Sequence, residues 1–145
     1  MQIRSISILA LLLVWAAPAG ARNTERFLSA RAAAESEKGR AYLLDVPFYL
    51  KGEPHPPVAK EISEVTSANS ASGAMRGDAS SCQSAFLSAL KNLQQRARES
   101  GADAIVDLVS ITRGQETESA SDFRCVAGAV IAHVGLKGKL VDLRD

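Results

Sequence analysis

The chain has 145 residues, 46% of them hydrophobic, and its 17 Lys and Arg residues against 16 Asp and Glu residues leave a formal net charge of +1 at pH 7. A chain of this length typically forms a single domain that can bury its own core. Its balanced charges argue against a nucleic-acid-binding protein and against a polybasic membrane-binding segment, because both need clustered Lys and Arg.

The first 21 residues predict a signal peptide. Arg4 supplies a positive charge, residues 6–17 form an almost unbroken apolar run, and Ala19-Gly20-Ala21 matches the small-residue pattern before a cleavage site. We therefore expect a mature chain that begins at Arg22 and carries no net charge. The apolar run is shorter than the roughly 20 residues of a membrane-spanning helix, and no cysteine follows the cleavage region to carry a lipid. The expected location is the periplasm or the exterior of the cell, without a membrane anchor.

Residues 22–40 are rich in Ala, Glu, Arg and Lys and predict an N-terminal helical arm that ends near Gly39. The alternative is a loosely docked extension. Residues 41–145 are expected to form a single α+β domain. Its first strand is predicted over residues 41–50, at a sheet edge, because Pro47 cannot donate a backbone hydrogen bond.

Two segments that follow are expected to be irregular. Residues 51–57 contain Gly52 and three prolines, which is too many for regular structure. Residues 64–66 favour a strand, whereas the Ser-, Ala- and Gly-rich residues 67–81 predict a mobile connection.

The clearest periodicity begins at Cys82 and predicts an amphipathic helix that continues to about residue 100. Its apolar residues, which include Phe86, recur at three- and four-residue spacing. Ser80 or Ser81 is expected to cap the start of this helix, and Gly101 to take a left-handed conformation after its end.

The C-terminal part of the chain predicts strands over residues 104–111 and 123–134, paired antiparallel across a polar loop at 112–121, and a short edge strand at 139–143. The expected fold class is therefore α+β, with one main amphipathic helix packed on a small, mainly antiparallel sheet.

Several of these segments resemble known proteins. The helix, the turn Gly101-Ala102-Asp103-Ala104-Ile105-Val106 and the segment Cys125-Val126-Ala127-Gly128-Ala129-Val130 resemble the YbjQ-like fold. Glu64-Val65-Thr66-Ser67 and Ser81-Cys82-Gln83 are similar to segments of the Rcs stress-sensor lipoprotein, although this chain has one cysteine pair and no lipid site. Pro47-Phe48-Tyr49, His55-Pro56 and residues 85–90 resemble uncharacterised exported bacterial proteins often labelled excinuclease ATPase subunit. The YbjQ resemblance implies a homo-oligomer, and the naming of that family suggests heavy-metal binding.

No motif for nucleotide hydrolysis or for catalysis stands out. The Gly138-Lys139 pair has neither the spacing nor the hydroxyl residue of a phosphate-binding loop, and the chain has no G-x-S-x-G motif. His55, His133, Cys82 and Cys125 are scattered, whereas zinc ligands usually come in close pairs, so we expect no metal and no cofactor.

The remaining candidate residues favour structural roles. Asp103 is expected in a turn, and Asp107 on the strand face opposite Val106 and Leu108. His133 is expected to be half-buried at a strand end and His55 to be solvated. Phe48, Tyr49 and Phe123 are expected in the core.

The two cysteines, Cys82 and Cys125, form an even pair in a small exported domain, which favours a structural disulfide. A redox-active pair or two separate thiols are the alternatives. Cys82 begins a helix, where a thiolate is favoured, but the C-x-x-C spacing of thioredoxin-type sites is absent.

The sequence therefore supports two main functional hypotheses. The first is a non-enzymatic binding or interaction module of the periplasm or envelope, which holds an unknown protein or small molecule through the loops at 51–57 and 67–81. The second is a thiol-dependent redox or metal-binding protein that uses Cys82 and Cys125. A homo-oligomeric subunit is a third hypothesis.

Overall fold

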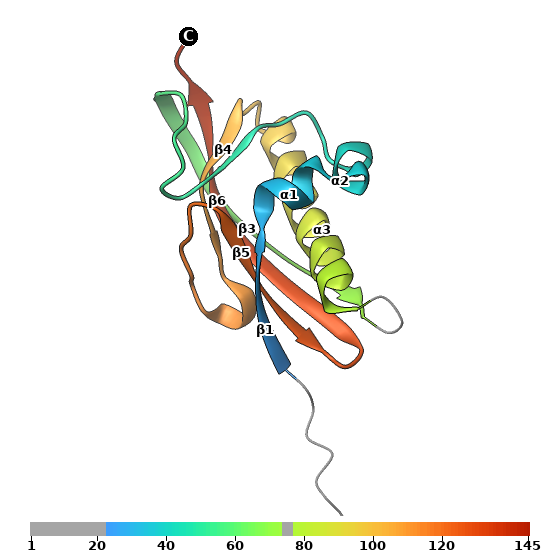
Figure 1. Cartoon of the computed structure of the whole chain (residues 1–145). Coiled ribbons are helices and arrows are strands. Elements are labelled where there is room, and N and C mark those ends of the chain that lie inside the picture. Colours follow the sequence, from blue (N-terminus) through green and yellow to red (C-terminus); the bar gives the residue numbers. More distant parts are fainter. Residues whose placement is uncertain (1–22, 74–76) are drawn as a thin grey trace, which may run out of the picture.

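The computed structural model describes residues 23–73 and 77–145, so the predicted signal peptide lies outside the described residues. The fold is α+β: a curled six-stranded sheet with a long helix on one face and two short helices at its side (Figure 1). No helix in the described part of the chain is both long enough and apolar enough to cross a membrane.

The elements follow one another in an order that mixes strands and helices. The strands are β1 (Asn23–Ser29), β2 (Phe48–Leu50), β3 (Val58–Ser72), β4 (Ala104–Ser110), β5 (Asp122–Gly128) and β6 (Ile131–Leu143). The helices are α1 (Ala30–Glu35), α2 (Glu37–Tyr42) and α3 (Asp78–Glu99), and a short turn, η1 (Thr112–Gly114), follows β4.

The strand β6 is the centre of the sheet. One edge of β6 pairs antiparallel with β3, from Ile131 opposite Ser72 to Leu143 opposite Val58. The other edge is shared, because β5 pairs with the start of β6 and β4 pairs with its second half. The strand β1 extends the sheet beyond β5, and β2 pairs parallel with β4. The sheet therefore divides into two branches on one side of β6.

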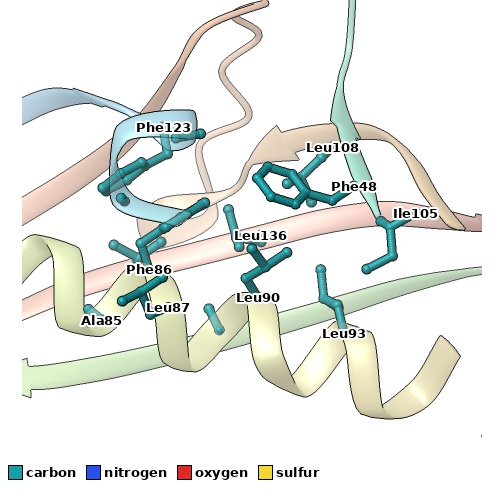
Figure 2. Close-up of a cluster of buried hydrophobic side chains, with 14 of the residues drawn as sticks. Phe48, Ala85, Phe86, Leu87, Leu90, Leu93, Ile105, Leu108, Phe123 and Leu136 are labelled. Atoms are coloured by element: carbon teal, nitrogen blue, oxygen red, sulfur yellow. The ribbon is translucent and has the colours of Figure 1, made fainter. Parts of the chain in front are cut away.

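The helix α3 covers one face of this sheet and supplies much of the core (Figure 2). Phe86 is fully buried, and its ring stacks on the ring of Phe123 from β5 with centroids 4.2 Å apart. The β6 residues that face α3 are apolar and buried: Ala132, Val134, Leu136 and Leu140. The predicted packing of an amphipathic helix on the sheet is confirmed.

The helix α3 begins four residues earlier than Cys82, at Asp78, and Gly77 precedes it with φ 79°. The carboxylate of Asp78 lies in the first turn, where the helix dipole favours a negative charge. Ser81, which was expected as a cap, is buried, and its hydroxyl donates to the carbonyls of Gly77 and Ser72. Gly101 has φ 71°, as expected for the residue after the helix.

The N-terminal helical arm predicted over residues 22–40 is wrong in its first part. Residues 23–29 form β1, whose Leu28 packs against the core while the residues on either side of it are exposed. Two short helices follow and meet at Ser36, whose hydroxyl accepts from the N–H of Gly39. Gly39 lies inside α2, where a Cβ atom would come within 2.3 Å of the Ala33 carbonyl oxygen.

The mobile connection predicted over residues 67–81 is wrong at both ends, and residues 74–76 in its middle lie outside the described residues. The strand β3 continues to Ser72, and α3 begins at Asp78. Small polar residues have a low intrinsic preference for strands, but pairing with β6 along their whole length overrides that preference. The strand predicted at 41–50 is short, since only Phe48–Leu50 pairs, and it lies at a sheet edge as expected.

The predicted hairpin between residues 104–111 and 123–134 is replaced by a different pairing. The segment 123–134 contains all of β5 except Asp122 and the beginning of β6, and the two strands turn back on each other after Gly128. The partner of β4 is β6. Residues 139–143, predicted as an edge strand, lie at the centre of the sheet as the last part of β6, because β3 and β4 pair with its two edges.

Candidate functional site

Within residues 23–73 and 77–145, the face of the sheet that points away from α3, called here the outer face, carries no α-helix. Side chains alternate along β6, so His133, Lys137 and Lys139 point outward while their neighbours point toward α3. In Figure 1 the orange segment after β4 lies on the side of the sheet away from α3. The outer face is therefore where a partner or ligand can reach the sheet.

One end of the outer face is apolar. Ala104, Val106 and Val141 are buried there, and Tyr49, Val58 and Leu143 pack against them. His55 is exposed nearby, with its ring centroid 5.7 Å from that of Tyr49. The expectation that Tyr49 belongs to the core is thus met only in this small second cluster, where Tyr49 is half-buried.

The middle of the outer face is charged and internally paired. Lys51 pairs with Glu118 at 2.6 Å, Lys137 pairs with Glu116, and Lys139 lies 3.5 Å from the carboxylate of Asp107. The hydrogen bond from Lys137 lowers the pKa of the Glu116 carboxyl below its ordinary value. In the same way, the hydrogen bond to Glu118 raises the pKa of Lys51. These opposite charges neutralise one another, so this region offers little net charge to a ligand.

Asp107 occupies a β-bulge in β4. Its φ is 51°, and the register between β4 and β6 shifts between Val106 and Val109. The prediction that Asp107 lies on the face opposite Val106 and Leu108 is confirmed for Leu108, which packs in the core on the α3 side. It is wrong for Val106, because the bulge turns both Asp107 and Val106 toward the outer face. Opposite the bulge, Gly138 leaves room for Ile105, whose Cγ2 atom would lie 2.7 Å from an added Cβ.

The other end of the outer face is hollowed into an open groove of about 1010 Å³, called here the outer groove. The outer groove is open to solvent and not an enclosed cavity. The outer groove is lined by Ala68, Asn69, Ser70, Ile111, Arg113, Gly114, His133, Val134 and Gly135. None of these residues is acidic.

One wall of the outer groove is the chain that leaves β4. The N–H of Ile111 donates to the Gly135 carbonyl at 2.8 Å, and the chain then rises over β6. A Cβ atom at Gly135 would lie 3.1 Å from the backbone of Ile111, so a larger residue would push this wall away. Arg113 and Gly114 follow with φ values of 55° and 75°.

Buried polar groups hold this wall where the two branches of the sheet separate. The Thr112 hydroxyl donates to the Arg124 carbonyl at 2.7 Å and accepts from the Gly135 N–H at 3.1 Å. The Ser110 hydroxyl accepts from the Arg124 N–H at 2.8 Å. The buried guanidinium of Arg124 donates to the Thr112 carbonyl and to Glu25. β4 and β5 do not pair with each other in the sheet, and these hydrogen bonds connect the two strands instead.

The floor of the outer groove contains a pair of polar side chains. His133 Nδ1 lies 2.6 Å from the Ser70 hydroxyl oxygen, because the two residues are directly opposite in the β3–β6 pairing. His133 is half-buried, as expected, and lies near the start of β6. Sequence reasoning missed Ser70, because its partnership with His133 depends on a register across 63 residues of chain.

The two cysteines form a disulfide between α3 and β5. The Cα atoms of Cys82 and Cys125 are 5.8 Å apart, and neither side chain is exposed. Neither histidine contacts this bond, since His55 lies against Tyr49 and Pro56 while His133 contacts Ser70. Among the described residues, no group of three or more His, Cys, Asp or Glu side chains could hold a metal ion.

Glu53 ties the loop at 51–57, which was predicted to bind a partner, to α1. Arg31 of α1 donates two hydrogen bonds to the Glu53 carboxylate, at 2.7 and 3.0 Å, and a third to the Phe48 carbonyl. The hydrogen bonds from Arg31 lower the pKa of Glu53. Asp103, expected in a turn, accepts from the Leu143 N–H at 2.8 Å. Both carboxylates are therefore occupied by structural contacts.

Comparisons of this chain with protein-family models, with curated proteins and with solved structures found no significant match.

Proposed function

We propose that this protein is a non-enzymatic binding module of the cell envelope, exported to the periplasm or the exterior, and that it binds its ligand in the outer groove. The observation that carries the proposal is the outer groove itself: an open hollow on the face of the sheet that α3 leaves uncovered. Its floor contains Ala68 and Ser70 of β3 and His133 of β6, and its wall is fixed by buried hydrogen bonds. A largely preformed concave surface of this kind is typical of ligand sites.

The chemistry of the outer groove favours binding over catalysis. The Ser70 hydroxyl has a histidine beside it, but no carboxylate lines the outer groove to orient the His133 ring as in a catalytic triad. The alternative function, thiol redox chemistry or metal binding through Cys82 and Cys125, would have to act through a disulfide that is completely buried. Titration of thiols in the native protein distinguishes these two functions, because the redox alternative needs at least one reactive thiol.

The export proposal rests on the order of charged, apolar and small residues before Arg22 and on the disulfide, which persists in oxidising compartments. The intact mass of the exported protein tests it. A mature chain that begins at Arg22 is expected, and a chain that still carries the apolar run would contradict it.

The binding proposal is tested by native mass spectrometry of protein purified from its own envelope fraction. We expect wild-type protein to carry a bound mass and Ala68→Trp protein to lose it, because an indole at Ala68 would fill the floor of the outer groove. The control is Arg98→Trp, which places the same indole at an exposed position of α3. A bound mass that persists in Ala68→Trp but disappears in Arg98→Trp would place the site on the helical side and overturn the proposal.

A further inference from the structure

The cations of the outer face differ in whether they have a carboxylate partner. Lys51, Lys137, Lys139 and Arg124 pair with Glu118, Glu116, Asp107 and Glu25 respectively. Arg113, at the rim of the outer groove, forms no ion pair among the described residues. Its guanidinium makes only a long contact of 3.5 Å with the side-chain oxygen of Asn23. An uncompensated positive charge therefore lies beside a groove that contains no acid.

The backbone at Arg113 departs from the usual preference of its turn. The N–H of Gln115 donates to the Thr112 carbonyl, and both residues between them, Arg113 and Gly114, have positive φ, as in a type I′ turn. The first of these two positions favours Asn, Asp or Gly, and an arginine there costs backbone strain. Local folding preference does not explain the arginine, whereas contact of its guanidinium with a ligand does.

The other polar groups of the outer groove can also donate hydrogen bonds. The Ser70 hydroxyl and His133 Nδ1 bond to each other, which leaves Nε2 of His133 without a partner among the described residues. When Ser70 donates to Nδ1, the ring carries its proton on Nε2 and can donate it to a ligand. Arg113 and His133 thus supply donors to one hollow, and a guanidinium matches the two oxygens of a carboxylate or phosphate.

We infer that the outer groove binds a small ligand through an oxyanion, a carboxylate or a phosphate group, held by Arg113 and His133. This inference rests on the proposed function, because it names the class of ligand for the same groove. A carboxylate and a phosphate both present at least two acceptor oxygens to a guanidinium, and defined compounds distinguish the two groups.

The test is a titration of ¹⁵N-labelled mature protein with inorganic phosphate, with citrate and with glucose as a neutral control, each at an ionic strength matched with sodium chloride. We expect saturable shifts of the amides at 68–70, 113–114 and 133–135 with phosphate, citrate or both, and none with glucose. Which anion binds more tightly identifies the source of the oxyanion.

Two variants separate a specific site from general attraction. Arg113→Asn suits the turn and removes the cation, so we expect it to fold and to weaken anion binding by at least about tenfold, since a charged hydrogen-bonding partner is lost. Arg98→Gln removes a cation from the exposed side of α3 and should leave the affinity unchanged. Equal weakening by both variants, unchanged affinity in Arg113→Asn, or no anion-induced shifts in the wild type would overturn the inference. If envelope-derived ligand still binds in the outer groove in that case, the proposed function stands without the oxyanion.

Discussion

Gln94 is a polar residue on the buried face of α3, and its side-chain amide forms three hydrogen bonds with the backbone of another segment. The side chain accepts a hydrogen bond from the Leu44 N–H and donates to the carbonyls of Leu44 and Val46, each at 2.9 Å. These contacts fix the chain between α2 and β2, a stretch without regular structure whose backbone groups need partners. The Gln94 side chain thus forms the hydrogen bonds that a neighbouring strand would otherwise give this segment.

Replacing Gln94 with Leu should therefore destabilise the protein by about 2–3 kcal/mol, since it leaves buried backbone groups without partners. Urea-induced unfolding measures the change. Gln95→Leu at the neighbouring exposed position is the control and should stay within about 0.5 kcal/mol of wild type. If the two variants behave alike, Gln94 does not hold the segment.

Arg113 illustrates a conflict between stability and binding at a single residue. Because the first position of a type I′ turn favours Asn, Arg113→Asn should raise the free energy of unfolding by about 0.5–1 kcal/mol. Arg113→Val, which places a β-branched residue at φ 55°, should lower it. Thermal unfolding of the three proteins tests this order, and a loss of stability in Arg113→Asn would show that the guanidinium contributes to the fold.

Among the elements, α1 and the turn between β2 and β3 are joined by the pair of Arg31 and Glu53. The guanidinium also lies over the Phe48 ring, 4.3 Å from its centroid. The contact holds an N-terminal helix against the sheet edge, and its strength depends on the charge of Glu53.

The pH dependence of this pair has a definite sign. The pKa of Glu53 is lowered in the folded protein from its ordinary value of 4.5, so its stabilisation is complete above that value and is lost as the pH falls through the lowered pKa. Glu53→Gln should cost about 1–2 kcal/mol at neutral pH, a figure reduced by the partial exposure of Arg31. Unfolding measured from neutral to acidic pH should show the gap between the two proteins closing. A gap that widens in acid would contradict the assignment.

The disulfide joins α3 to β5, and its two cysteines are separated by 43 positions in the sequence. Restricting an unfolded chain in this way typically stabilises a protein by about 2–4 kcal/mol, so the double variant Cys82→Ala, Cys125→Ala should lose about that much. Non-reduced peptide mapping should recover the two cysteine peptides linked. Two freely titratable thiols in the native protein would contradict the bond and would favour the redox alternative.

An element could be predicted from the sequence when neighbouring residues determine it, and not when pairing with a distant strand determines it. The helix α3 and the strand β4 carry local periodicity, so both were found from the sequence, as was the left-handed Gly101. The strand β3 was found only over residues 64–66, because the Ser-, Ala- and Asn-rich residues that follow have a low preference for strands and become a strand only through pairing with β6. The bulge at Asp107 likewise breaks the alternation from which its face was predicted.

At the scale of the whole molecule, the two faces of the sheet have different roles. One face is covered by α3 and the disulfide, and its residues were largely predictable as apolar positions. The outer face is assembled from segments far apart in the chain, so the outer groove could not be predicted as a whole. The sequence singled out His133, and the segment 67–81 that it proposed as ligand-binding contains Ala68, Asn69 and Ser70 of the outer groove. The pairing of Ser70 with His133 depends on the register of β3 and β6, and Arg113 was missed because it comes to the outer groove through the turn after β4.

The central claim is that the outer groove is the ligand site, and chemical-shift mapping of the ¹⁵N-labelled mature protein with an extract of its own envelope tests it most directly. We predict that the perturbed amides cluster at 68–70, 111–114 and 133–135, and that Ala68→Trp abolishes these changes while Arg98→Trp preserves them. Perturbations confined to α3 or to residues 51–57, or no perturbation at all, would contradict the claim.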